Sequence, residues 1–77
     1  MELKNLVANI LKVEASEINE DSSPDNLESW DSFNSLMIIS NIEKEFNITF
    51  TTKEAMNIKN YGDIEKLVNQ KIYGNRN

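Results

Sequence analysis

The stretch that decides the fold is Leu27-Glu28-Ser29-Trp30-Asp31-Ser32-Phe33-Asn34-Ser35-Leu36, where a long polar, acidic segment gives way to the most apolar helix-like run of the chain. Asp31 stands directly before that run and can cap a helix by accepting hydrogen bonds from the free backbone N–H groups of its first turn. Ser32 then lies in that turn, where a phosphate on its hydroxyl would meet the positive end of the helix dipole. By itself the pair is weak evidence of a site, since Asp-Ser at a helix start is more often a plain cap.

The apolar residues after Ser32 predict a helix over residues 32–46, but they fall into two groups on opposite sides of it. The group that we assign to the core consists of Ile38, Ile39, Ile42 and Phe46. The group in the first two turns consists of Phe33, Leu36 and Met37. Two interpretations of this second group stay open: a central helix buried all round, or an exposed apolar patch that docks a partner beside the serine.

The chain before this stretch predicts one helix and one long loop. A helix over about residues 2–13 is indicated by apolar residues at three- and four-residue spacing, namely Leu3, Leu6, Val7, Ile10 and Leu11. Residues 14–31 are polar, and we expect a loop pinned to the core by three isolated apolar residues, Ile18, Leu27 and Trp30. Trp30 is interpreted either as a plug of the core or as a part of the partner surface.

The chain after residue 46 predicts an extended linker over residues 47–50, a short helix and a last longer helix. Thr52 is expected to cap the short helix, which runs through residues 53–56, and Asn60 the last one. The buried stripe of the last helix consists of Ile64, Leu67, Val68 and Ile72, and Gly74 ends it. We therefore expect a single all-α domain over residues 1–77 with three longer helices, one short helix and a frayed tail from residue 74.

Composition excludes several classes of chemistry. The chain has no Cys and no His, which removes thiolate and Ser-His nucleophiles, the commonest general base and the commonest metal ligand. A net charge of -5 argues against nucleic acid binding and favours partners with basic surfaces. No apolar run reaches the length of a membrane span and the N-terminus lacks a signal-peptide pattern, so a cytoplasmic protein is expected.

The acidic loop matches a calcium-binding loop only in part. Asp21, Ser23 and Asp25 occupy its positions 1, 3 and 5, but position 6 is Asn26 instead of Gly and position 12 is Ser32 instead of Glu. A solvated acidic surface is the favoured interpretation, and no metal site is predicted.

Three motifs resemble the acyl carrier protein family, and the resemblance covers nearly the whole chain. They are residues 27–36, Ile42-Glu43-Lys44-Glu45-Phe46-Asn47-Ile48, and Tyr61-Gly62-Asp63-Ile64. The Asp before Ser32 is typical of acyl carriers, whereas peptidyl carriers often have His in that place.

The resemblance implies a four-helix bundle in which a phosphopantetheinyl transferase attaches the 4'-phosphopantetheine of coenzyme A to Ser32, with Asp31 as the cap beside it. The arm's thiol would carry acyl or related groups as thioesters, so that a non-enzymatic chain without Cys borrows its sulfur from a cofactor. Partner enzymes of fatty acid, polyketide or other acyl-transfer biosynthesis would dock on Phe33, Leu36, Met37, Glu28 and Glu43. An acyl chain would lie near Ile42, Ala55 and Ile58. We expect a monomer.

The chain departs from the family pattern in three places. Met37 stands where many fatty-acid carriers have an acidic residue, Lys44 interrupts the acidic end of the helix, and the segment before Ser32 lacks the usual Gly. These departures indicate a specialised stand-alone carrier with more apolar partner recognition. The alternative hypothesis is a small acidic helical adaptor that keeps the carrier fold but binds its partner without a cofactor.

Overall fold

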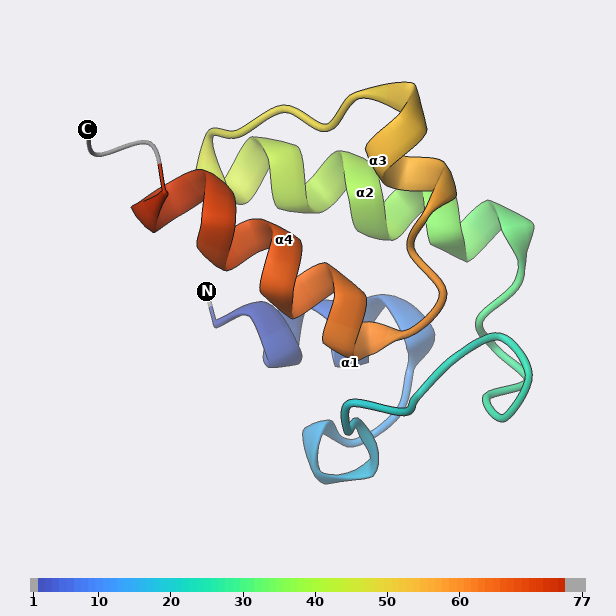
Figure 1. Cartoon of the computed structure of the whole chain (residues 1–77). Helices are drawn as coiled ribbons and strands as arrows, with labels where there is room; N and C mark the ends of the chain where they lie inside the picture. The colour runs from blue at the N-terminus through green and yellow to red at the C-terminus, as the bar shows by residue number, and fades with distance from the viewer. Residues whose placement is uncertain (1, 75–77) are drawn as a thin grey trace.

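The computed structural model describes residues 2–74, and within them the chain is all-α (Figure 1). Its elements are α1 (Leu3–Leu11), a 3-10 turn (Ala15–Glu17), α2 (Ser32–Phe46), α3 (Thr52–Met56) and α4 (Tyr61–Tyr73). Three longer helices, one short helix and a long loop between the first two were predicted, and this order is confirmed. The predicted frayed tail lies outside the described residues except for Gly74.

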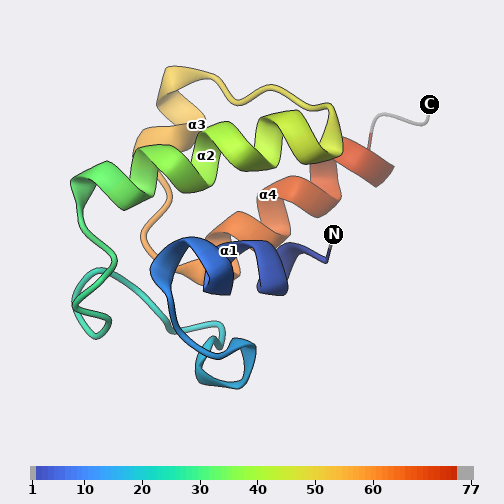
Figure 2. The same cartoon turned by 180° about the vertical axis from the view of Figure 1, so that it is seen from behind.

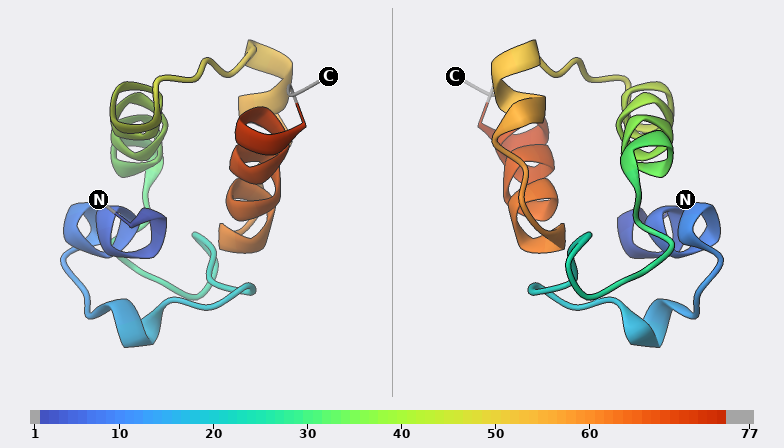
Figure 3. Two further views of the ribbon diagram at one scale, coloured as in Figure 1. Left: turned by 90° about the vertical axis from the view of Figure 1, so that its left-hand side faces the viewer. Right: turned by 90° about the vertical axis from the view of Figure 1, so that its right-hand side faces the viewer.

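The helices form two pairs with the long loop beneath them. Figure 3 shows α1 and α2 on one side of the molecule, α4 and α3 on the other, and the loop crossing below both pairs. α1 packs against α2. Seen from behind, these two helices lie in front of α3 and α4 (Figure 2). The core is built from apolar side chains of α1, α2, α4 and the connecting segments, whereas no residue of α3 is fully buried.

The core contains the residues that the helical patterns predicted. Its most deeply buried large side chains are Leu11, Ile18, Ile38, Ile42, Ile64 and Val7. Ile39 and Phe46 are partly buried and pack against this core, as do Leu27 and Ile58. Trp30 is only 3% exposed, so its interpretation as a core plug is confirmed. The three predicted loop anchors therefore hold the loop to the bundle.

Side chains and the start of α4 fix the course of the loop. Ser22, a buried polar residue, accepts the backbone N–H of Asn19 on its hydroxyl at 2.9 Å. The carbonyl of Ser22 accepts the N–H of Tyr61 at 2.8 Å, and the carbonyl of Glu20 accepts that of Gly62 at 3.0 Å. A Cβ at Gly62 would come within 3.1 Å of the Glu20 carbonyl oxygen, so this glycine permits the close approach.

Two of the three predicted caps are confirmed, and one is wrong by a residue. Asp31 accepts the N–H of Asn34, and Asn60 accepts that of Asp63 at 2.8 Å. The short helix is capped by Thr51 instead of Thr52. Thr51 forms a capping box, in which its hydroxyl accepts the N–H of Glu54 and the Glu54 carboxylate accepts the N–H of Thr51. Thr52 is the first residue inside the helix.

The bounds of α1 differ from the prediction, whereas α2 begins and ends at the predicted residues. α1 ends at Leu11 because Lys12 adopts a left-handed conformation with φ 60°, which no residue pattern signalled. Asn47 ends α2 in the same way, with φ 56°. α4 ends at Tyr73, and the N–H of Gly74 still donates to the carbonyl of Gln70.

Tyr61 is buried at the start of α4, with 3% of its surface exposed. Burial raises the pKa of its phenol to about 12, and the negative charges of Glu65 and Glu2 act in the same direction. The side chain therefore stays neutral far above physiological pH.

Candidate functional site

The start of α2 is organised around Ser32. Ser32 is the first residue of the helix and is exposed. Before it, the Asp31 carboxylate accepts the backbone N–H of Asn34 at 2.9 Å. The side-chain amide of Asn34 in turn donates to the carbonyl of Ser29 at 2.7 Å, which ties the end of the loop to the helix. Ser32 thus projects from a fixed backbone into solvent.

The helix start is suited to a negatively charged group on Ser32. The backbone N–H groups of Ser32 and Phe33 belong to the first turn and have no carbonyl partner within the helix. They add to the partial positive charge at the N-terminal end of the fifteen-residue α2. An anion on the hydroxyl would therefore be stabilised by dipoles that folding has already placed.

Trp30 and Ser35 connect the loop to the first turns of α2. The indole Nε1–H of Trp30 donates to the Oγ of Ser35 at 2.8 Å. This contact gives the buried indole the hydrogen-bond partner that a buried Trp requires. It also places the ring against the face of α2 that points into the bundle, which explains why Trp30 is not part of the outer surface.

An apolar patch lies on the outer face of α2 next to Ser32. Phe33 is 69% exposed, Leu36 70% and Met37 39%, so the interpretation of α2 as a helix buried all round is wrong. Met56 of α3 is 76% exposed and adds to the solvent-facing apolar surface. Met56 was missed because a single Met in a short helix carries no periodic signal. Exposed apolar groups gathered in this way are typical of a docking surface.

A groove of about 590 Å³ starts at Ser32 and runs between α2 and α3. Its lining residues are Ser32, Ser35, Leu36, Ile39, Phe50, Thr51, Thr52, Ala55 and Met56. Leucine, isoleucine, phenylalanine, alanine and methionine side chains supply most of its walls. The exposed serine therefore stands at the edge of an apolar channel.

A smaller inner pocket of about 150 Å³ lies deeper in the bundle. It is lined by Pro24, Trp30, Ser35, Ile38, Ile39, Ala55, Ile58 and Ile64. Ser35, Ile39 and Ala55 line both the groove and the inner pocket, so these three residues stand where the two cavities adjoin. Of the three residues predicted to lie near an acyl chain, Ala55 and Ile58 line the inner pocket, whereas Ile42 is fully buried and lines neither this pocket nor the groove.

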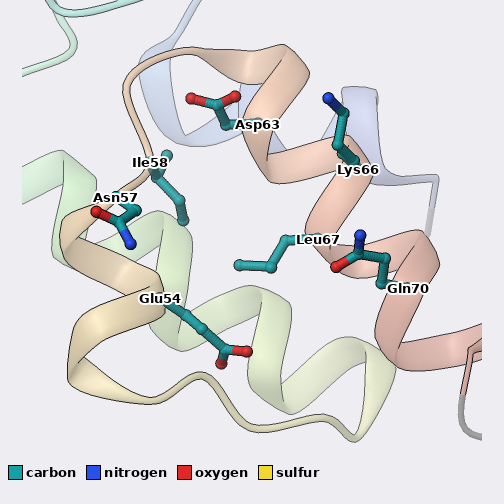
Figure 4. A pocket seen from close by; sticks show the side chains of 7 residues that line it. All are labelled: Glu54, Asn57, Ile58, Asp63, Lys66, Leu67 and Gln70. Atoms are coloured by element: carbon teal, nitrogen blue, oxygen red, sulfur yellow. The ribbon is translucent and has the colours of Figure 1, made fainter.

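A third cavity of about 190 Å³ lies between α3 and α4. Figure 4 shows Ile58 and Leu67 directed into it, with polar side chains around them. The polar side chains are Glu54, Asn57, Asp63, Lys66 and Gln70. Ile58 lines both this cavity and the inner pocket and so stands between them.

The two predicted acidic docking residues differ in their surroundings. Glu28 is exposed on the loop before Ser32. Glu43 is only partly exposed, and its Oε2 accepts the backbone N–H of Phe50 at 2.8 Å. Glu43 therefore holds the linker between α2 and α3, a structural role that the sequence did not reveal because the two residues are seven positions apart.

Lys71 of α4 holds α3 against the bundle. Its Nζ lies 2.8 Å from the Glu54 carboxylate and 5.7 Å from the centre of the Phe50 ring. The hydrogen bond from Lys71 lowers the pKa of Glu54, and the backbone hydrogen bond from Thr51 lowers it further. The wall of the groove that α3 forms is thus fastened at Glu54 and Phe50.

Neither a metal-binding cluster nor a membrane-spanning helix is found in the described part of the chain. Residues 2–74 contain no group of three or more His, Cys, Asp or Glu side chains that could hold a metal ion. No helix among them is both long and apolar enough to span a membrane.

Comparisons with known proteins agree on one family. Residues 2–68 match the family model described as the phosphopantetheine attachment site. Acyl carrier proteins from two strains of Porphyromonas gingivalis are each 39% identical to the chain over 59 residues, which are 77% of this chain and 76% of the relative.

Solved structures show the same fold. A putative acyl carrier protein from Mycobacterium tuberculosis is 25% identical, with a TM-score of 0.74 over 83% of this chain and 85% of that one. The solution structure of a holo acyl carrier protein from Geobacter metallireducens has a TM-score of 0.83 at 24% identity, over 91% of this chain and 80% of its own.

Proposed function

Because the chain belongs to the acyl carrier protein family and has its 4'-phosphopantetheine attachment domain, we propose that Ser32 is the residue that receives this group. The observation that carries the proposal is the exposed Ser32 hydroxyl in the first turn of α2, directly after the Asp31 cap. In the phosphopantetheinyl transferase reaction the Ser32 oxygen would attack the phosphorus next to the pantetheine in coenzyme A. The pyrophosphate bond would break, adenosine 3',5'-bisphosphate and the hydroxyl proton would leave, and Ser32 would hold the group as a phosphodiester. The protein would then carry acyl or related intermediates to partner enzymes.

The residues around Ser32 fit this group. The exposed hydroxyl is accessible to a transferase, and the N–H groups of the first turn favour the phosphodiester charge. When bound, the group supplies a thiol on which cargo is held as a thioester. Ser35 is a poorer acceptor, because its hydroxyl is partly buried and already accepts the Trp30 indole N–H.

The groove and the inner pocket are suited to shelter the cargo. Leu36, Ile39 and Ala55 give the groove apolar walls that begin next to Ser32. An acyl chain that lies along these walls is transferred from water to an apolar surface. This transfer is favourable by about 0.8 kcal/mol per buried CH₂. Passage inward lies past Ser35, Ile39 and Ala55, where the two cavities adjoin.

The apolar patch is proposed as the docking surface for the transferase and for acyl-loading and acyl-using enzymes. Phe33, Leu36 and Met37 supply the apolar area, and the exposed Glu28 and Asp31 supply negative charge beside it. A partner with an apolar contact surface rimmed by basic residues complements this combination. Such partners would be cytoplasmic enzymes of fatty acid, polyketide or related acyl-transfer biosynthesis.

The test is incubation of the apo protein with coenzyme A and a broad-specificity phosphopantetheinyl transferase, followed by intact mass spectrometry. Wild type and Ser35→Ala are expected to gain one phosphopantetheine, whereas Ser32→Ala gains none. Circular dichroism should show Ser32→Ala folded as wild type, since an exposed first-turn serine contributes little to packing. Modification of Ser32→Ala at the wild-type rate would contradict the proposal.

A further inference from the structure

We propose that Trp30 limits the acyl group held in the inner pocket to about six carbons, so that short acyl chains are the cargo that this carrier shelters completely. The inference rests on the proposed function, because it concerns cargo carried on Ser32. Three observations support it: the size of the inner pocket, the buried residues that close its inner wall, and the polar cavity beyond Ile58.

The inner wall of the pocket is closed by core residues. Trp30, Ile38 and Ile64 are 3%, 1% and 1% exposed, so each is packed on its far side by the rest of the bundle. The Nε1–H of Trp30 is fixed by the 2.8 Å hydrogen bond to Ser35, at the place where the groove and the pocket adjoin. Moving the indole aside would break this bond and disturb the packing of the core.

The volume of the pocket sets the length of chain that fits. The inner pocket measures about 150 Å³. An engineered apolar cavity of roughly that volume holds benzene, a molecule of about six carbons. Each methylene that enters an apolar site is favoured by roughly fourfold, so occupancy should rise with chain length only until the pocket is full.

A longer chain that extends beyond the inner pocket toward α4 passes Ile58, which separates this pocket from the cavity between α3 and α4 (Figure 4). Glu54, Asp63 and Lys66 line that cavity, and an apolar tail would displace water from these charged groups without replacing their hydrogen bonds. Carbons beyond about the sixth are therefore left in the open groove next to Leu36 and Met56.

The experiment loads the protein from amide analogues of acyl-coenzyme A with two to twelve carbons in the acyl chain. Trp30 is the only Trp of the chain, so its indole N–H gives a single NMR signal that reports on the pocket. We expect its chemical-shift change and the melting temperature to rise up to about six carbons and to stay constant for longer chains. A continued rise to ten or twelve carbons would overturn the inference.

Substitutions test whether the chain-length limit depends on the residues that line the pocket or on general changes in core packing. Trp30→Leu should move the plateau in melting temperature to about eight carbons, because it enlarges the pocket. Should Trp30→Leu not fold, Ile64→Val enlarges the pocket with Trp30 in place, and Ile42→Val is its control: both isoleucines are at most 1% exposed, but only Ile64 lines the pocket. A plateau that moves by the same amount in both valine variants would also overturn the inference.

The outcomes for the two proposals are distinct. If the mass of the protein shows no loading on Ser32, the proposed attachment is wrong and the chain-length inference fails with it. If loading is complete but neither readout reaches a plateau, only the chain-length inference is wrong.

Discussion

Two truncations in α2, Leu36→Ala and Ile38→Ala, should distinguish a side chain that docks a partner from one that stabilises the fold. Leu36 is 70% exposed and Ile38 is 1% exposed, although both stand in the same part of one helix. Complete burial of such a side chain is worth about 1.5 to 3 kcal/mol. In the isolated protein Leu36 is mostly exposed and gains only a minor part of this free energy. Leu36→Ala should therefore lower the free energy of unfolding by about 0.5 to 1 kcal/mol.

The remaining area of Leu36 is available to a partner. It corresponds to about 1 to 2 kcal/mol if the partner covers it, which is a decrease of about 5- to 30-fold in kcat/KM for phosphopantetheinyl transfer. Ile38→Ala instead leaves a cavity in the core and should lower the free energy of unfolding by about 2 to 5 kcal/mol. That loss is comparable with the whole net stability of about 3 to 5 kcal/mol expected for so small a domain.

The assay combines urea unfolding of each variant with steady-state kinetics of one transferase. Leu36→Ala is expected to keep its unfolding midpoint close to wild type and to lose transfer efficiency, whereas Ile38→Ala unfolds at much lower urea. A docking role for Leu36 is excluded if Leu36→Ala is destabilised as strongly as Ile38→Ala, or if its kcat/KM stays within about twofold of wild type.

Three further predictions concern the supports of the site. Asp31→Ala should lower the free energy of unfolding by about 1 kcal/mol in urea titration because Asn34 loses its cap, and Asp31→Asn, which can still accept, should not. Lys71→Met should speed amide hydrogen exchange in α3, since the contact with Glu54 is lost; unchanged exchange there would show that Lys71 does not fasten α3. Tyr61 has a folded-state pKa raised from 10.0 to about 12, so it stabilises the fold below pH 10 and this contribution is lost as the pH rises through 12. Wild type should therefore lose more stability than Tyr61→Phe between pH 9 and pH 11.5, and equal losses would show that the pKa of Tyr61 is not raised by folding.

Capping residues in the sequence predicted where α2 and α4 begin, whereas the capping box that starts α3 was missed. Asp31 and Asn60 were identified because a polar cap before an apolar run acts within three residues. Thr51 and Thr52 are both capping residues, and only the pairing of Thr51 with Glu54 three residues later distinguishes them. That pairing is present in the sequence and would have placed the start of α3 correctly.

The remaining features depend on contacts between distant residues. The periodicity of α2 separates its two faces, but it does not show which face the bundle covers, so the exposure of Phe33 and Leu36 needed the structure. Ile42 shares the inner face of α2 with Ile38, yet only Ile38 lines the inner pocket, opposite residues of α3 and of the long loop such as Ala55 and Trp30. The hydrogen bond between Trp30 and Ser35 likewise depends on how the loop closes against the helix.

Attachment of phosphopantetheine to Ser32 is tested most sharply by locating the modified residue within the sequence. The modified protein would be digested and its peptides fragmented in a mass spectrometer, so that the phosphopantetheine is assigned to a single residue. The structure predicts that it lies on Ser32 alone, because this hydroxyl is exposed at the start of α2, and not on the nearby Ser29 or Ser35. Assignment to either of these two serines, or to none, would show that Ser32 is not the attachment site.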